Sequence, residues 1–173
     1  MRFIAFISVL VVLFVFLTKP VTGQAVVLFH NERAHSVGPD AAPPGRNTRV
    51  ITSQEGSAVG VSWSGNDITL SVAGSYYVSI SAQIDTEPLA HRIILHDAVN
   101  DIDLVVGPGY QAPTPATIDT IITVPVLGSV TFNVVHEYIG SLSAFLGYTN
   151  TYDEPGMTIP TNDQYMTIKV QIL

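Results

Sequence analysis

Two runs of alternating apolar and polar residues, separated by a glycine, constrain the fold of this chain more than any other feature of its sequence. Residues 67–72 and 75–84 each alternate, and Ala73-Gly74 stands between them. Successive side chains of a β-strand point to opposite faces, so a strand with one face in a core must alternate in this way. Residues 63–84 therefore predict two strands around a glycine turn. We expect the core side of this strand pair to include Trp63, Gly74, Tyr76 and Val78.

The rest of the chain also favours short strands over helices. After the apolar N-terminus, no stretch shows sustained i, i+3, i+4 spacing of apolar residues, and proline and glycine mark loops at 32–46, 107–115 and 149–163. Many short strands with regular turns predict an all-β sandwich, a jelly roll of about eight to ten antiparallel strands. The other strands are expected at 24–30, 47–52, 57–63, 91–97, 102–106, 117–126, 129–137, 144–148 and 165–173.

The central strand pair resembles a known superfamily. Trp63, then Ile68-Thr69-Leu70, then Gly74-Ser75-Tyr76-Tyr77-Val78, is similar to the matching part of the complement component 1q globular head and of the tumour-necrosis-factor-like (TNF-like) jelly rolls. There a Gly-x-Tyr-x-(aromatic or aliphatic) run follows a short apolar strand, and Val78 stands where Phe is more usual. Residues 165–173, the expected final strand, resemble this superfamily more weakly. The resemblance implies a compact homotrimer that acts as a non-enzymatic recognition or ligand module.

The N-terminus predicts a secreted protein. Met1-Arg2 forms a short positive region, residues 3–17 are apolar, and small or medium residues follow at Val21-Thr22-Gly23. The apolar run is shorter than the roughly 20 residues that span a bilayer, so we expect a cleaved signal peptide at 1–23. The alternative is an uncleaved signal anchor. Residues 24–173 are then a single extracellular jelly-roll domain, of a size that buries a substantial core.

Charge and cysteine content exclude several classes of function. The formal net charge is −7, and cleavage of the signal would remove two of the seven basic residues and none of the fourteen acidic ones. So acidic a surface repels nucleic acid and anionic membranes, although the charge also simply keeps a secreted protein soluble. The chain has no cysteine, which rules out disulfides and thiolate metal sites.

Several strands carry apolar residues on the face that should meet solvent. Tyr77 is opposed to Tyr76, Ile121 to its neighbours in 117–126, and Val135 to Val134. A second apolar face indicates a second burial surface. In the resembled superfamily this surface is the axis of the homotrimer, so Tyr77, Ile121 and Val135 are the predicted interface. The alternative is that loops such as 149–163 cover it within one chain.

Metal and catalytic motifs are weak. The five histidines lie in separate elements or on opposite strand faces, and we interpret them as scattered surface or edge residues. Asp97, Asp101 and Asp103 cluster in one hairpin and are calcium candidates, which the resemblance supports because some complement 1q heads bind calcium, but we favour a solvated turn. No cofactor is otherwise expected. The sequence has no Gly-x-Ser-x-Gly elbow, and no carboxylate is singled out for glycoside chemistry, so we expect no enzyme.

Tyrosines in the predicted loops indicate a binding surface for a protein or a glycan, because tyrosine makes a large contact area at low entropy cost. They are Tyr110, Tyr148 and Tyr152. The sequence therefore predicts a secreted homotrimer with an unidentified protein or glycan partner. Two alternatives stay open, namely a structural subunit of an extracellular or virion-like coat and a monomeric carbohydrate-binding jelly roll.

Overall fold

The structure of this protein is a computed structural model, which describes residues 25–34, 41–84, 90–111, 114–139, 144–145 and 162–173. These residues form strands and turns and no helix, so none of them belongs to a helix that could cross a membrane. The strands are β1 (Val26–Ala34), β2 (Ala41–Ala42), β3 (Gly45–Thr48), β4 (Ser53–Glu55), β5 (Val61–Ser64), β6 (Asp67–Leu70), β7 (Gly74–Ala82), β8 (Ala90–Asp97), β9 (Ile102–Val106), β10 (Tyr110–Gln111), β11 (Ala116–Val124), β12 (Val130–Ile139), β13 (Ala144–Phe145) and β14 (Asn162–Ile172).

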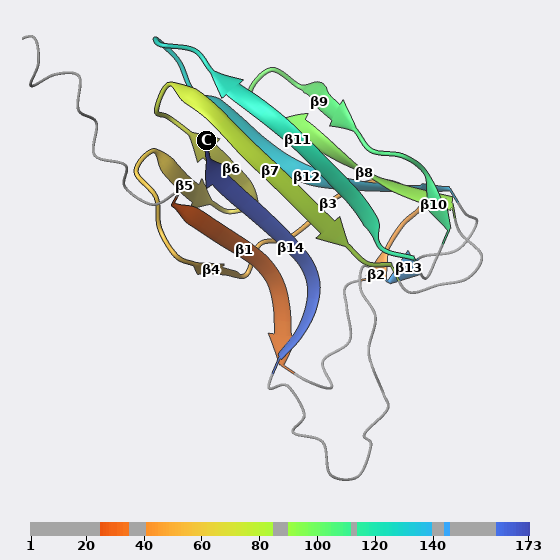
Figure 1. The fold of residues 1–173 in the computed structure, drawn as a ribbon. Coiled ribbons are helices and arrows are strands. Elements are labelled where there is room, and N and C mark those ends of the chain that lie inside the picture. Colours follow the sequence, from red (N-terminus) through yellow and green to blue (C-terminus); the bar gives the residue numbers. More distant parts are fainter. Residues whose placement is uncertain (1–24, 35–40, 85–89, 112–113, 140–143, 146–161) are drawn as a thin grey trace, which may run out of the picture.

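Two antiparallel sheets face each other as the layers of a sandwich (Figure 1). The five-stranded sheet has the order β11-β7-β14-β1-β4. The seven-stranded sheet has the order β10-β8-β12-β6-β5, with β3 beside β12 and β9 beside β8. Neighbours in each sheet come from distant parts of the chain, because β14 lies between β1 and β7 and β12 lies between β6 and β8. This is the all-β jelly-roll sandwich that the sequence predicts.

The core lies between the sheets and is built from the inward residues of both. Tyr76 and Val78 of β7 are buried there, and so are Ile68 and Leu70 of β6. Trp63 is only partly buried, but it packs on the core, with its ring centroid 6.3 Å from that of Phe29 in an edge-to-face arrangement. Alternation in residues 63–84 therefore identifies the inward face of the strand pair.

The expectation that Gly74 lies in the core is wrong. Gly74 is exposed and begins β7 with φ of 150°, and a Cβ atom built on it would have no neighbour within 4 Å. Glycine adopts this conformation readily, whereas residues with a side chain rarely do. The residue therefore shapes the turn into β7 and contributes nothing to packing.

Strand boundaries near residue 50 also differ from the prediction. The expected strand at 47–52 ends at Thr48 as β3, and Ser53–Glu55, which lie between the strands expected at 47–52 and 57–63, form β4. Ser53–Glu55 are polar, so periodicity gives no signal for them, and they form a strand because they pair with residues 28–30 of β1. Tertiary pairing decides strand formation here.

Candidate interaction surface

The outer face of the five-stranded sheet, which points away from the core, carries two of the three residues predicted for an interface. Strand register aligns the side chains of this outer face in rows across the sheet. One row runs Ile121, Tyr77, Gln171, Val26, and the next runs Asp119, Ser79, Lys169, Leu28. Tyr77 and Ile121 are thus direct cross-strand neighbours, and Ile121 keeps 60% of its surface exposed.

Tyr77 is held in place by a charged residue on each side. Its hydroxyl donates a hydrogen bond to Asp119 Oδ1 over 2.5 Å, and Lys169 Nζ lies 5.8 Å from the centroid of its ring. The hydrogen bond raises the pKa of the Tyr77 hydroxyl above its ordinary value and lowers the pKa of Asp119 below its own. The phenol is therefore a neutral donor whose ring stands on the outer face in a defined position.

Val135, the third predicted interface residue, lies on the other sheet. It belongs to β12, where Val134 points into the core and Val135 points away from it. Its neighbours across the strands are Thr48 and Ile94, and only 5% of its surface is exposed. The structure therefore does not bring Val135 to the same face as Tyr77 and Ile121. The sequence pattern shows that β11 and β12 each carry an apolar residue on the outward face. It does not show that the two strands belong to different sheets.

A cluster of charged side chains covers the seven-stranded sheet near Val135 and borders a hollow of about 500 Å³. Arg46 donates to both carboxylate oxygens of Asp103, over 3.1 and 2.5 Å. His96 lies between two carboxylates, with Nδ1 3.0 Å from Asp103 Oδ1 and Nε2 3.2 Å from Asp101 Oδ1. The Arg46 guanidinium is the main cause that lowers the pKa of Asp103.

The three calcium candidates do not converge on one ion. Asp103 is paired with Arg46, and Asp101 faces His96. Asp97 closes the β8–β9 turn, because its Oδ1 accepts hydrogen bonds from the backbone of Val99 and Asn100 over 2.8 and 2.9 Å. No group of three or more potential ligands that could hold a metal ion occurs among the described residues. These carboxylates therefore do not fit a calcium site of several converging oxygens.

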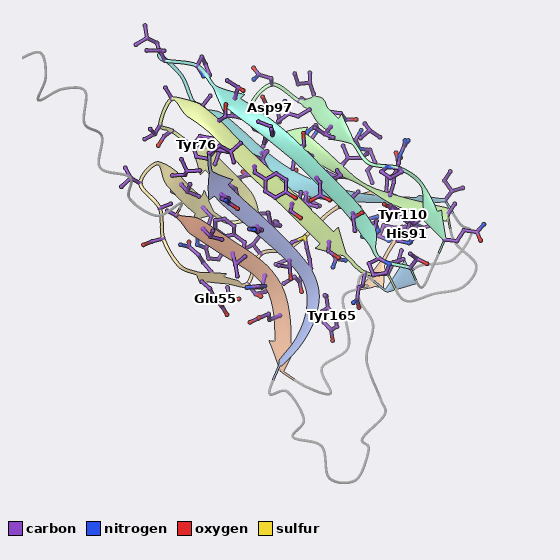
Figure 2. The ribbon with its side chains drawn as sticks, in the orientation of Figure 1. Glu55, Tyr76, His91, Asp97, Tyr110 and Tyr165 are labelled. Atoms are coloured by element: carbon purple, nitrogen blue, oxygen red, sulfur yellow. The ribbon has the colours of Figure 1, made fainter. Side chains whose placement is uncertain are left out.

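The loop tyrosines give little support for a binding surface within the described residues. Tyr110 is half-buried, and its hydroxyl lies 2.8 Å from Thr117 Oγ1 (Figure 2). Its polar end therefore makes a contact inside the domain. Tyr148 and Tyr152 lie outside the described residues.

The interpretation of the histidines as scattered surface or edge residues is wrong for three of the five. His30, His91 and His136 are buried, with exposed fractions of 3%, 2% and 0%. His91 and His136 also contact each other directly, with Nδ1 of the first 2.8 Å from Nε2 of the second. They are 45 positions apart, and only the pairing of β8 with β12 brings them together. One signal in the sequence could have identified a buried histidine, namely the apolar alternation of 130–138, because it places His136 among the inward residues.

Comparison with known proteins identifies the fold. No protein-family model and no curated protein sequence matches the chain. The crystal structure of murine APRIL at pH 8.0 matches with a TM-score of 0.52 and 8% identity, over 87% of this chain and 99% of that chain. The same protein at pH 8.5 matches with a TM-score of 0.50 and 9% identity over the same shares. The structure of Eiger TNF from S. frugiperda matches with a TM-score of 0.39 and 11% identity, over 87% of this chain and 92% of that chain.

Identity this low is informative about the fold and about nothing finer. None of these three structures is a complement 1q head, so that half of the resemblance stays a prediction. The APRIL matches span nearly their whole length, and both sheets of the sandwich are antiparallel. The chain therefore has a TNF-like jelly-roll fold.

Proposed function

We propose that this protein is a secreted, non-enzymatic ligand or recognition module that assembles as a homotrimer and binds a protein or glycan partner. The TNF-like fold supports the class of module. The signal-peptide pattern at 1–23 supports secretion of residues 24–173. The outer face of the five-stranded sheet supports self-association and is the proposed contact between subunits.

One observation carries this proposal, namely the exposure of Ile121 beside Tyr77. Ile121 and Ile122 are consecutive, so they point to opposite faces of β11, and only Ile122 reaches the core. An isoleucine exposed by 60% in the middle of a strand gains about 1–2 kcal/mol when it is fully buried. Three such residues, each beside a positioned tyrosine, provide a driving force for a symmetric assembly.

Light scattering behind a sizing column tests the proposal on residues 24–173. We expect the mass of a trimer for the wild type and of a monomer for Ile121→Glu, because the new carboxylate would be buried without a partner. Ile139→Glu is the matched control. Ile139 is also a strand isoleucine, exposed by 78%, but it lies at the end of β12 in the other sheet.

The masses distinguish the alternatives as well. A trimer that persists in Ile121→Glu, or one that Ile139→Glu dissociates, would refute the proposed contact. A monomeric wild type would refute the trimer and favour the carbohydrate-binding jelly roll. Assemblies much larger than a trimer would favour a coat subunit.

A further inference from the structure

Three ionisable side chains are buried together at one end of the sandwich. They are Arg49, which follows β3, His91 of β8 and His136 of β12, and their exposed fractions are 1%, 2% and 0%. Tyr138 is paired with His91 and His136 with Ile93, so the two imidazoles are diagonal neighbours on the inward face. Figure 2 shows His91 at this end of the molecule beside Tyr110 of β10.

The hydrogen bonds of the two imidazoles define one arrangement of protons. His91 Nε2 lies 3.0 Å from the carbonyl oxygen of Thr114, which only accepts, so this nitrogen carries the proton. His91 Nδ1 is then an acceptor, and His136 Nε2, 2.8 Å away, donates to it. The remaining nitrogen, His136 Nδ1, is buried and has no hydrogen-bond partner among the residues that the structure describes. Two neutral rings thus link β12 to β8 and β8 to Thr114.

The surroundings of this chain of bonds oppose a positive charge. Burial, then the charge of Arg49, lowers the pKa of His136 to about 2, and burial lowers the pKa of His91. Among the described residues, the other titratable groups here are the phenols of Tyr110, with its ring centroid 6.3 Å from that of His91, and Tyr138. The Arg92–Glu137 ion pair sits on the opposite face of the same strands. Neither imidazole is hydrogen-bonded to a carboxylate of the described residues.

We propose that His91 and His136 form an acid-sensitive latch, which holds Thr114 and β10 against β8 while both rings are neutral and releases them when the rings take up protons. A protonated His91 would set its Nδ1–H against the Nε2–H of His136 across 2.8 Å. The other tautomer of His136 would only move the N–H to the buried Nδ1, which makes no hydrogen bond to the described residues. β10 is paired through two residues alone, so it is the element that opens first.

The direction of the effect follows from proton uptake. The closed state keeps both rings neutral, whereas in the open state they meet water and titrate near a pKa of about 6.5. The open state therefore binds more protons, and opening becomes more favourable as the pH falls below about 6.5. Between pH 7.5 and 5.0, His136 alone raises the opening equilibrium about 30-fold, and the lowered pKa of His91 adds to the effect in the same direction.

Hydrogen exchange of residues 24–173 at the two pH values, corrected for intrinsic rates, measures this equilibrium locally. The reporters are the amides of Gly107 and Thr114, which donate to Ile93 O and Gln111 O. We expect their protection to fall by about 30-fold or more at pH 5.0, while amides in the middle of β7 keep theirs. Unchanged protection at Gly107 and Thr114, or an equal loss in β7, would overturn the latch.

Two substitutions assign the effect to the pair. Gln at position 136 places an amide N–H near the position of Nε2 but does not titrate, so His136→Gln should reduce the acid response by about 30-fold. His96→Gln changes a histidine on the outward face of β8 and should leave the response unchanged. If His136→Gln fails to fold, nitrogen chemical shifts of the wild-type rings replace it. Rings that are still neutral at pH 6.0 support the latch. Rings that titrate near the ordinary pKa of about 6.5, while the amides of Gly107 and Thr114 stay protected, contradict it.

Discussion

Tyr76 and Tyr77 are adjacent residues of one type on opposite faces of β7, so truncating each in turn tests the assignment of the two faces. Tyr76 has 1% of its surface exposed, and its hydroxyl donates to the carbonyl oxygen of Val72 over 2.7 Å. Tyr77 stands on the outer face and contacts Asp119 and Lys169. The two alanine variants delete the same atoms from different environments.

We expect Tyr76→Ala to lower the free energy of unfolding by about 3–5 kcal/mol, because it leaves a cavity between the sheets. That is a large part of the roughly 5–15 kcal/mol that stabilises a typical domain, so the yield of folded protein should collapse. The midpoint of thermal unfolding should fall by about 2–4 °C for each kcal/mol. Tyr77→Ala removes an exposed hydrogen bond and a cation–π contact, which contribute little to stability within one subunit because water screens them.

Thermal unfolding followed by circular dichroism at several protein concentrations separates the two roles. The loss in Tyr76→Ala should not depend on concentration, because the cavity lies within one subunit. If Tyr77→Ala lowers the unfolding midpoint by more than a small amount, the difference from the wild type should shrink as the protein concentration rises, because the substitution would then act by weakening assembly. Equal losses that are independent of concentration would show that the assignment of inner and outer faces is mistaken.

Two further predictions concern a glycine and the tyrosine–carboxylate contact. A Cβ atom on Gly60, where φ is +80°, would lie 2.7 Å from Val72 Cβ, whereas one on Gly65, at φ +60°, meets open space. We therefore expect Gly65→Ala to lower the free energy of unfolding in urea by roughly 1 kcal/mol, from backbone strain, and Gly60→Ala to lower it by clearly more. Asp119→Asn keeps an acceptor but removes the charge, so the pKa of the Tyr77 hydroxyl should fall toward its ordinary value. Tyrosinate absorbance during an alkaline titration measures it, and an unchanged titration curve would count against the hydrogen bond.

The strand pair in residues 63–84 shows what local pattern can predict. Its alternation correctly identifies Tyr76 and Val78 as inward residues, because the pleat of a strand alone decides which side chains share a face. Alternation does not reveal the conformation of Gly74, where φ of 150° and an exposed turn account for the glycine. It also gives no sign of β4, whose polar residues form a strand through their pairing with β1.

The candidate sites depend on pairing between distant strands. Tyr77 and Ile121 meet because β7 pairs with β11, and Val135 is separated from them because β12 belongs to the other sheet. The contact between His91 and His136 requires the register of β8 against β12. A spacing of 45 residues carries no information about such a contact, because a jelly roll places neighbouring strands far apart in the chain.

The sequence by itself thus determined the class of fold and the inward face of the central strands, and it predicts a secretory signal. These are local properties, set by side-chain alternation, turn residues and hydropathy. The tertiary structure decided which outer residues share a surface, which carboxylates are already paired and which histidines are buried. The physical reason is that sheet order and register are cooperative properties of the whole sandwich, so no single strand encodes its neighbours.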